Sequence, residues 1–276
     1  MALNSRRITN ARESNLCMSN VEESISASIL KKELLSLIPK LPFGAPATNI
    51  TTPHDTCKQI ERVVSNLEIL TPLPPLARSP KALETLDGDW QLVYSDASEI
   101  TRISKLPLGF RLGAVFQPID LAANRFENQA FVKHKFLLGS GHTRVVADFY
   151  LGDIGDTNRA GVVNIGERVN VKFKKVIFTL RRFLVVPTFG KIRKIATPNG
   201  PSEQKGVVPC IDVTYLDDNM RISRGGDGSL FILTRPFSKV KPLSMLSKTV
   251  VDDIVVDPQN PTYDASVDLL PSGSRD

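Results

Sequence analysis

The side chains that could carry out catalysis or bind a metal ion are few and widely separated in this sequence. The three histidines are His54, His134 and His142, and the three cysteines include no CxxC pair. The chain contains no HExxH, GxSxG or GxxxxGK[ST] motif and no GxGxxG motif after a strand, the common signatures of metalloproteases, serine hydrolases and nucleotide-binding enzymes. Asp217 and Asp218 have no third carboxylate at a spacing suited to a metal, so a turn is the simpler interpretation. We therefore predict a protein that is not an enzyme and needs no metal or cofactor.

Basic side chains are concentrated in one stretch of the chain. The sequence has 35 Lys and Arg against 29 Asp and Glu, a net charge of +6, and residues 168–194 contain no acidic residue. The basic residues of this stretch are Arg168, Lys172, Lys174, Lys175, Arg181, Arg182, Lys191, Arg193 and Lys194. They are compatible with solvated strand edges, with contact to an anionic lipid surface, or with nucleic-acid binding. Nucleic acid is the least favoured, because Phe173, Phe178 and Phe183 follow the apolar alternation and are not expected to be exposed for base stacking.

The elements that must position these residues begin with two amphipathic helices. Apolar residues recur at three- and four-residue spacing over 21–38, which predicts a helix that ends at Pro39. A second helix begins at Thr52-Pro53 and ends before the proline-rich sequence TPLPPL at 71–76. Residues 21–80 are therefore interpreted as a small helical cap with a stiff linker.

From residue 86 to 235 the pattern changes to short alternating runs separated by turn residues, which predicts β-structure. The predicted strands are 90–95, 112–120, 125–133, 144–151, 160–165, 168–174, 176–186, 209–215, 219–223 and 229–235. The apolar alternation shifts by one residue at Lys174 and Lys175, which predicts a β-bulge or a turn there. Eight or more strands in about 150 residues can form a sandwich or a closed barrel, and periodicity does not choose between them.

The two ends of the chain differ in composition from this β region. Residues 1–20 contain three arginines and one acidic residue among many Ser and Asn, which fits either an organelle targeting segment or a disordered terminus. Residues 236–276 have little periodicity, and we expect a polar, largely disordered tail. No apolar run approaches the ~20 residues that span a bilayer, so any membrane contact is expected to be peripheral. The odd number of scattered cysteines indicates a reducing compartment.

The single tryptophan stands at the start of the first predicted strand, in the sequence LDGDWQLVYSD at 86–96. That position suits a barrel that must close one end with a bulky side chain. The last predicted strand ends in Arg235, whose guanidinium could stack on the indole ring of Trp90 and cap nearby carbonyl groups. We expect these two residues to plug one end of a barrel whose other end opens onto a cavity.

Four motifs in the same order resemble the plastid lipid-associated protein family, also called fibrillins of plastoglobules. The most specific is IDVTYLDDNMRISRGGDGSLFILTR (211–235), which matches the T-Y-L-D, R-I-x-R-G and L-F-x-L-x-R pattern of the family's C-terminal signature. LDGDWQLVYSD resembles the family's L-x-G-x-W-x-L-x-Y start, and its Gly-Asp-Trp part resembles the lipocalin GxW motif. VFQPIDLAANRFEN (115–128) and VVSNLEILTPLPPL (63–76) resemble two further family segments.

The resemblance implies a mainly β fold, with a lipocalin-like antiparallel barrel at 81–235 preceded by the helical segment at 21–80. It implies a non-enzymatic plastid protein, peripheral to plastoglobules or thylakoids, that binds a prenylquinone, a carotenoid or an acyl lipid. The nine basic residues of 168–194 are then expected to contact anionic lipid. The residues expected to form the plug or line the cavity are Gly88, Trp90, Leu92, Tyr94, Tyr215, Arg221, Phe231, Leu233 and Arg235.

Two alternatives remain open on the sequence. The first is a scaffold with a solid core that binds no ligand and recruits a protein partner, such as an enzyme of prenyl-lipid synthesis. The second is a metabolic enzyme on a lipocalin-like frame, which would need a buried histidine or carboxylate in the cavity, and the sequence offers no convincing candidate.

Overall fold

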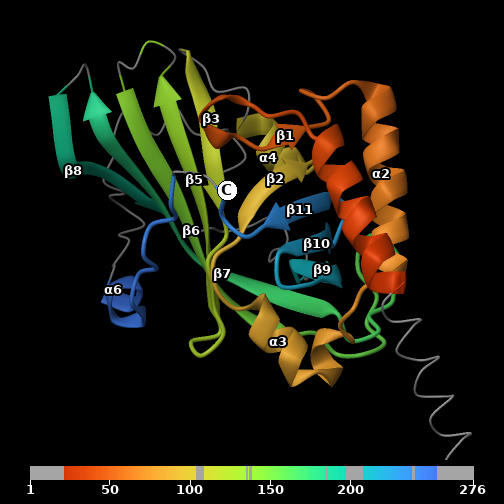
Figure 1. Cartoon of the computed structure of the whole chain (residues 1–276). Helices are drawn as coiled ribbons and strands as arrows, with labels where there is room; N and C mark the ends of the chain where they lie inside the picture. The colour runs from red at the N-terminus through yellow and green to blue at the C-terminus, as the bar shows by residue number, and fades with distance from the viewer. Residues whose placement is uncertain are drawn as a thin grey trace, which may run out of the picture.

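Eleven strands form one sheet in the part of the chain that the structure describes (Figure 1). The computed structural model describes residues 22–103, 109–134, 136, 139–183, 186–196, 208–237 and 240–253. The strands are β1 (Ala47–Thr48), β2 (Gln91–Ser95), β3 (Phe110–Phe116), β4 (Ile119–Asp120), β5 (Arg125–His134), β6 (Gly139–Leu151), β7 (Arg168–Phe183), β8 (Val186–Ala196), β9 (Cys210–Leu216), β10 (Met220–Gly225) and β11 (Leu230–Thr234).

Eight of these strands close into a ring. Each is antiparallel to its neighbours in the order β2-β11-β10-β9-β7-β6-β5-β3, and the ring closes where Gln91 of β2 pairs with Phe116 of β3. A sandwich would instead consist of two separate sheets with free edges. The predicted fold class, a mainly β protein with an antiparallel barrel and N-terminal helices, is confirmed.

Several predicted strand boundaries differ from those observed. The predicted strand 112–120 corresponds to β3 and β4, and β6 begins five residues earlier than predicted. The segments 168–174 and 176–186 correspond largely to one long strand, β7, in which Val146 of β6 pairs with Lys175 while the next residue, Ala147, pairs with Phe173. Lys174 is therefore the extra residue of a β-bulge, one of the two outcomes that the shifted alternation predicted. Residues 160–165 form no strand but part of the loop between β6 and β7, where several backbone hydrogen bonds join residues of the same loop, as from Asn158 N to the Val162 carbonyl oxygen.

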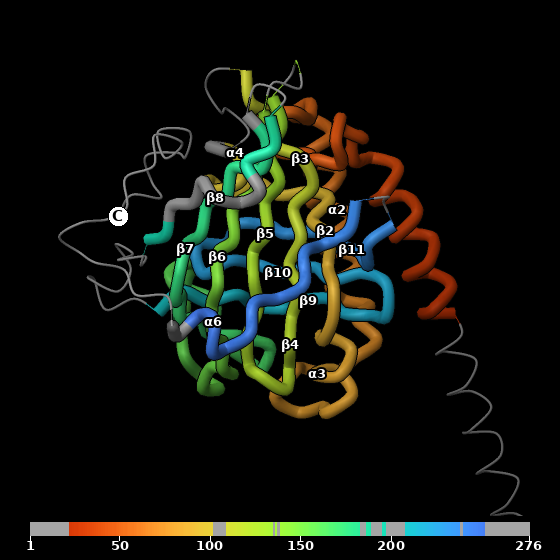
Figure 2. The backbone as a smooth tube through the Cα atoms, turned by 90° about the vertical axis from the view of Figure 1, so that its left-hand side faces the viewer, coloured from red at the N-terminus to blue at the C-terminus, as the bar shows by residue number. Residues whose placement is uncertain are grey.

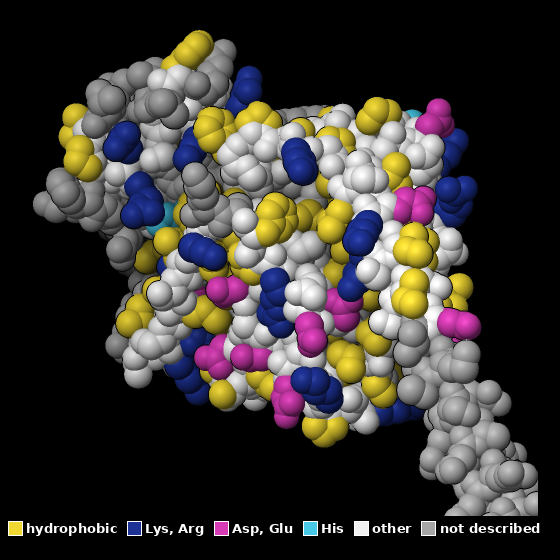
Figure 3. Space-filling model, in the orientation of Figure 1, with side chains coloured by type: hydrophobic (Ala, Val, Ile, Leu, Met, Phe, Trp, Pro, Cys, Tyr) yellow, Lys and Arg dark blue, Asp and Glu magenta, His cyan; other side chains and the backbone are white. Residues whose placement is uncertain are grey.

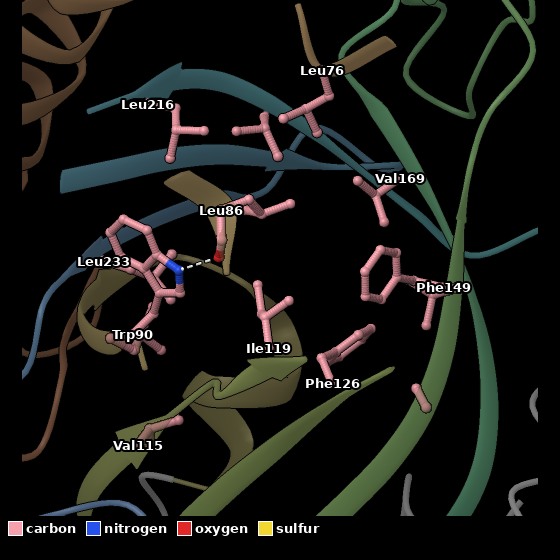
Figure 4. Close-up of a cluster of buried hydrophobic side chains, with 14 of the residues drawn as sticks. Leu76, Leu86, Trp90, Val115, Ile119, Phe126, Phe149, Val169, Leu216 and Leu233 are labelled. Atoms are coloured by element: carbon pink, nitrogen blue, oxygen red, sulfur yellow. Dashed lines mark hydrogen bonds between the residues drawn. The ribbon is translucent and has the colours of Figure 1, made fainter. Parts of the chain in front are cut away.

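The main core lies inside the ring, where alternate residues of each strand point inward. Its largest side chains come from β5, β6 and the start of β2 (Figure 4). The buried core residues on the strands of the ring are Leu92, Leu112, Val115, Phe126, Ala147, Phe149, Val169, Val171, Val213, Leu216 and Leu233.

A short helix, α3 (Pro80–Leu86), and the 3-10 turn η2 (Leu76–Arg78) lie at one end of the barrel (Figure 1). Sequence analysis placed this segment in the linker, because seven residues are too few to show helical periodicity. Helix α3 begins with residues typical of a helix N-terminus. The Ser79 side chain accepts a hydrogen bond from Ala82 N at 3.2 Å, and Pro80 occupies the first turn. The side chains of Leu76 and Leu86 enter the core from this end.

Two N-terminal helices cover the outer face of β2, β9, β10 and β11 (Figure 1). One spans residues 22–37 and the other is α2 (His54–Ile69), so both predicted helices are present within one or two residues of their expected bounds. Their apolar faces pack on outward side chains of the four strands. Arg224 of β10 pairs with Glu61 and Glu68 of α2 at 2.6 and 2.9 Å, which fixes that helix to the sheet. The connections contain η1 (Pro42–Gly44) and α4 (Ser98–Ile103).

The described part of the C-terminal region runs across the outer face of β5 and β6 to α6 (Lys248–Asp253), as Figure 2 shows. Its backbone binds buried polar side chains of the sheet: Leu246 N donates to Glu127 at 2.7 Å and Leu243 N to Gln129 at 2.7 Å. Such contacts use backbone groups, so the segment shows no apolar periodicity although it is ordered against the barrel. The remainder of the expected disordered tail lies outside the described residues.

Candidate functional site

Trp90 and Arg235 meet at the end of the barrel that α3 covers. The Trp90 side chain is fully buried, and its Nε1 donates a hydrogen bond to the Leu86 carbonyl oxygen at 2.8 Å (Figure 4). The guanidinium carbon of Arg235 lies 3.8 Å from the centroid of the indole ring. A planar cation at this distance from an indole face is attracted to it. The structure thus brings together two residues that are 145 positions apart.

The same guanidinium fastens the surrounding loops. Arg235 donates hydrogen bonds to the backbone carbonyl oxygens of Thr85, Asp87, Asp89 and Asp218, at 2.6 to 3.2 Å. These carbonyls belong to the end of α3, the connection between α3 and β2, and the β9–β10 turn. One side chain therefore ties three segments to the closed end of the barrel.

Gly88 occupies a position that only glycine suits. Its φ is +93°, and a Cβ atom there would lie 3.2 Å from Nη1 of Arg235. A side chain would be strained by the backbone conformation and would crowd the guanidinium. This accounts for the glycine of the Gly-Asp-Trp motif.

A small cavity lies inside the ring near the plug. Its volume is about 30 Å³, room for about two water molecules and far below the ~300–1,000 Å³ of a typical ligand site. Apolar side chains form most of its wall, and Figure 4 shows Ile119, Phe126, Phe149 and Val169 around one hollow. Its polar wall consists of Gln117, Arg221 and Ser223.

Arg221 is a buried cation that pairs with no acidic side chain in the described part of the chain. Only 4% of it is exposed, and its Nη2 donates a hydrogen bond to Oε1 of Gln117, whose Nε2 donates to Asn128. Burial, with a smaller contribution from the positive charge of Arg235, lowers the pKa of Arg221 to about 9. The guanidinium therefore stays charged at neutral pH, and its charge is not compensated by a carboxylate.

Two of the predicted cavity residues lie on the outer face of the barrel. Tyr94 and Tyr215 pack under the N-terminal helices, because a β-bulge precedes each of them. In β2, Leu92 pairs with Leu233 while Tyr94 pairs with the adjacent Ile232, so the extra residue between them reverses the alternation. The alternation of Trp90, Leu92 and Tyr94 in the sequence had placed all three on one face.

The other predicted strand residues point inward. Leu92, Leu233 and Phe231 belong to or pack against the main core, and Arg221 lines the cavity. Ser223 was missed as a site residue, although its spacing of two from Arg221 on a strand was a usable signal. Gln117 was noted only for its place in a family motif.

The barrel wall is uneven in height. β6 and β7 contain 13 and 16 residues, whereas β2 and β11 contain five each. β7 pairs with β9 at its start, through Asn170, and with β8 from Val176 onward, and within the described residues 171–175 pair with neither strand. Figure 1 shows the upper parts of β5 to β8 rising beyond the short strands. Within the described residues, β8 and β9 therefore do not pair with each other.

Four inward-facing apolar side chains of the barrel are only half-buried. They are Ala130, Val145, Phe173 and Phe231, from four different strands. Inner residues nearer the plug, such as Phe149 and Val171, are buried. Farther from the plug, Val132, Val176, Phe178 and Leu180 are buried again. The half-buried side chains therefore form a band between two buried clusters.

Three of the nine basic residues of 168–194 are exposed, namely Lys172, Arg181 and Arg182. Lys174 forms a partly exposed ion pair with Asp148 at 3.0 Å, and Lys175 is half-buried. Lys191, Arg193 and Lys194 belong to β8, but their side chains lie outside the described part of the structure.

Arg168 does not have the exposure that the predicted lipid contact requires, because it is buried. Only 3% of it is exposed, and its Nε and Nη2 donate hydrogen bonds to the two carboxylate oxygens of Asp212 at 2.7 and 2.8 Å. Asp212 lies directly opposite on β9. The partner is 44 residues away in the sequence, so the absence of nearby acidic residues gave no sign of this ion pair.

Glu167 yields a pH-dependent prediction. Burial, reinforced by the negative charges of Asp212 and Glu68, raises the pKa of Glu167 to about 7. The folded chain then holds this proton more tightly than the unfolded chain, so the ionised carboxylate lowers stability as pH rises from about 4.5 to 7. We expect Glu167→Gln to raise the free energy of unfolding at pH 8 by about 1 kcal/mol, discounted for partial solvent exposure, and to change it little at pH 4.5. Urea denaturation at both values measures this.

The control is Glu84→Gln, which removes an exposed carboxylate of α3. It should show no difference between the two pH values. An equal effect of Glu167→Gln at pH 4.5 and pH 8 would contradict the assignment of the raised pKa to Glu167.

The described residues hold no group of three or more His, Cys, Asp or Glu side chains placed to bind a metal ion. None of the helices in the described part is both long and apolar enough to cross a membrane.

These features define a class of protein: a closed, lipocalin-like antiparallel β-barrel with one plugged end, a buried cation inside and helices on its outer face. A family model described as PAP_fibrillin matches residues 28–234, which include most of the first helix, all of α2 and the whole ring. The chain belongs to this family, and the resemblance seen in the four sequence motifs is confirmed.

Similar curated proteins are plastid proteins by name. Over 240 residues the chain is 25% identical to plastoglobulin-1, chloroplastic, of Pisum sativum, covering 80% of this chain and 64% of that protein. It is 28% identical over 212 residues to plastid-lipid-associated protein 6, chloroplastic, of Arabidopsis thaliana, covering 74% and 68%. It is 25% identical over 225 residues to the chromoplast-specific carotenoid-associated protein of Cucumis sativus, covering 75% and 67%. The chain thus spans less than two thirds of plastoglobulin-1, and no solved structure matches it.

Proposed function

We propose that this chain is a non-enzymatic plastid protein that associates peripherally with a lipid surface, a plastoglobule or a thylakoid, and binds a hydrophobic small molecule. A prenylquinone, a carotenoid or an acyl lipid has the required chemistry. The observation that carries the proposal is the half-buried inner wall formed by Ala130, Val145, Phe173 and Phe231. A hydrophobic molecule that covered this inward-facing apolar surface would remove it from water. The names of the relatives, which are lipid-associated and carotenoid-associated plastid proteins, support the same assignment.

The ligand is tested by capture from a total plastid lipid extract. The purified protein would be incubated with the extract, separated by size exclusion, and its retained molecules identified by mass spectrometry. One enriched hydrophobic species at about one per chain supports the proposal. A protein that emerges without any enriched molecule contradicts it.

The outer surface offers two features suited to a lipid surface. Ile25 and Ile29, one helical turn apart on the helix of residues 22–37, are 55% and 60% exposed. The face in Figure 3 shows such hydrophobic side chains among charged groups of both signs. On β7, Lys172, Arg181 and Arg182 are exposed, and each basic residue near an anionic surface contributes about 1 kcal/mol.

We therefore expect the triple variant Lys172→Gln, Arg181→Gln, Arg182→Gln to bind anionic liposomes at least about tenfold more weakly in low salt, because three attractions to the surface are lost. Flotation with vesicles of phosphatidylcholine and phosphatidylglycerol measures the partition. The matched control, Lys58→Gln, Arg78→Gln, Lys81→Gln, removes three exposed charges elsewhere. Equal losses in both variants would reject β7 as the lipid-facing surface.

A second function is favoured by the small volume of the internal cavity. About 30 Å³ cannot hold a prenyl chain, and a packed interior suits a scaffold that recruits a protein partner, such as an enzyme of prenyl-lipid synthesis. The two functions separate in the capture experiment, since a scaffold would retain no lipid.

A further inference from the structure

One pair of polar side chains inside the barrel is buried without being satisfied. Arg221 and Ser223 are alternate residues of β10, both point inward, and both line the cavity. Arg221 is 4% exposed and Ser223 is 1% exposed. Among the described residues, Nε of Arg221 and Oγ of Ser223 have no hydrogen-bond partner. Buried donors of this kind are costly to leave unpaired, so two of them beside one cavity point to a ligand that accepts hydrogen bonds.

The charge around the cavity favours an anion. Arg221 has no acidic partner in the described part of the chain, and the second cation nearby, Arg235, is already bound to backbone carbonyl oxygens. The guanidinium carbons of both arginines lie within 5.3 Å of the centroid of the Trp90 ring, on a wall that is otherwise apolar. A single negative charge placed here would compensate the charge of Arg221 in a region of low dielectric constant.

The number of donors and the space select the type of anion. The two unsatisfied donors match the two oxygens of a carboxylate, one from the guanidinium and one from the hydroxyl. A phosphate has more oxygens and more charge than this wall can satisfy. The rest of the wall consists of side chains such as Phe126, Phe149 and Val213, which suit hydrocarbon and not water.

We propose that Arg221 and Ser223 bind the carboxylate of a fatty acid, whose hydrocarbon chain runs from the cavity along the half-buried side chains of the inner wall. The path is lined by Phe231, which pairs with Ser223, and by Phe173, two residues beyond Val171 of the cavity wall. Both phenylalanines are half-buried and pack against the main core. The 30 Å³ cavity receives the head group, and the chain covers these half-buried inner side chains. This inference rests on the proposed function only in requiring a hydrophobic ligand.

The test is calorimetric titration of the full chain with three probes. Decanoate carries both the carboxylate and the chain, decan-1-ol carries the chain alone, and acetate carries the carboxylate alone. We expect decanoate to bind at least about tenfold more tightly than either of the others, since only it makes the charge-assisted hydrogen bonds and buries the chain. Arg221→Met should weaken decanoate at least about tenfold and leave decan-1-ol unchanged, and Ser223→Ala should weaken decanoate several-fold.

The control variant is Arg182→Met, which makes the same exchange at an exposed position of β7 and should change no affinity. Thermal unfolding without ligand gives a second readout: Arg221→Met should melt at a higher temperature than the original chain, because it removes an uncompensated buried charge. A lower melting temperature would mean that the charge is already compensated within the protein, which overturns the site. If Arg221→Met does not fold, the decanoate affinity of Ser223→Ala tests the site instead. An affinity equal to that of the original chain overturns the proposal.

The outcomes also separate this inference from the proposed function. Equal binding of decanoate and decan-1-ol would overturn the carboxylate site while leaving a hydrophobic ligand in place. Equal binding of acetate and decanoate would assign the site to small anions and overturn the fatty acid. Binding of none of the probes would remove the inference and count against ligand binding in the barrel as well.

Discussion

Replacement of Trp90 by alanine is expected to lower the free energy of unfolding by about 3–5 kcal/mol. The indole ring is fully buried at the end of the barrel, and the surrounding strands cannot collapse into the space that it leaves. The change also removes the surface on which the guanidinium of Arg235 stacks at 3.8 Å and the hydrogen bond to Leu86. Because Trp90 is the only tryptophan, urea denaturation must be followed by circular dichroism.

Tyr150→Ala provides the comparison for this variant. Tyr150 is a large aromatic residue of β6 whose side chain is exposed, so its removal should cost well under about 1 kcal/mol. A loss under about 1 kcal/mol for Trp90→Ala would show that the barrel end does not depend on the ring. Trp90→Phe should lie between the two, since it keeps an aromatic face for Arg235 and loses the Nε1 hydrogen bond.

The second large effect is expected at the buried ion pair of Arg168 and Asp212. Asp212→Asn preserves the shape of the side chain but removes its charge, which leaves the Arg168 guanidinium buried without a carboxylate. Breaking one side of such a pair costs about 3–5 kcal/mol, and we expect a loss in this range by urea denaturation. The loop between β6 and β7 should also loosen, because Asp212 accepts a hydrogen bond from Asn158 of that loop.

The neighbouring pair of Lys174 and Asp148 is the matched control. It joins β7 to β6 at a similar distance, 3.0 Å, but more than a third of each side chain is exposed. Asp148→Asn should therefore change stability by less than about 1 kcal/mol. If Asp148→Asn and Asp212→Asn had the same effect, burial would not be the source of the strength of the inner pair. The double variant Arg168→Met, Asp212→Leu should recover part of the loss, since it leaves no charge unpaired.

These two predictions concern the framework, and both bear on the site. The Trp90 plug lies beside Arg221, and the Arg168–Asp212 pair is one residue from Val169 and Val213 of the cavity wall. Loss of either should disturb the inner wall. Ligand affinities are therefore best compared at Arg221 and Ser223, whose replacement leaves the plug and the ion pair intact.

The elements with regular periodicity were predictable from the sequence. The apolar spacing over 21–38 and 60–67 predicted two helices with one buried face, and turn residues delimited most of the strands. Trp90 and Arg235 were paired because a bulky ring at the start of one strand and a cation at the end of the last strand suit a barrel plug. For the helices and strands the signal lies within a few residues, where local geometry links side-chain spacing to one face of an element.

The features that the sequence pattern could not predict depend on contacts between segments that are distant in the sequence. A bulge before Tyr94 and another before Tyr215 moved both rings to the outer face, because the register with a partner strand, and not the alternation within a strand, sets the side on which a residue lies. Arg168 forms a buried ion pair only because β9 places Asp212 opposite it. The C-terminal segment binds the sheet through its backbone groups, which leave no trace in residue type. Composition and spacing thus determined the elements and the plug. The packing of strand against strand decided which polar groups are satisfied, and among the described residues it left Arg221 Nε and Ser223 Oγ inside the barrel without hydrogen-bond partners.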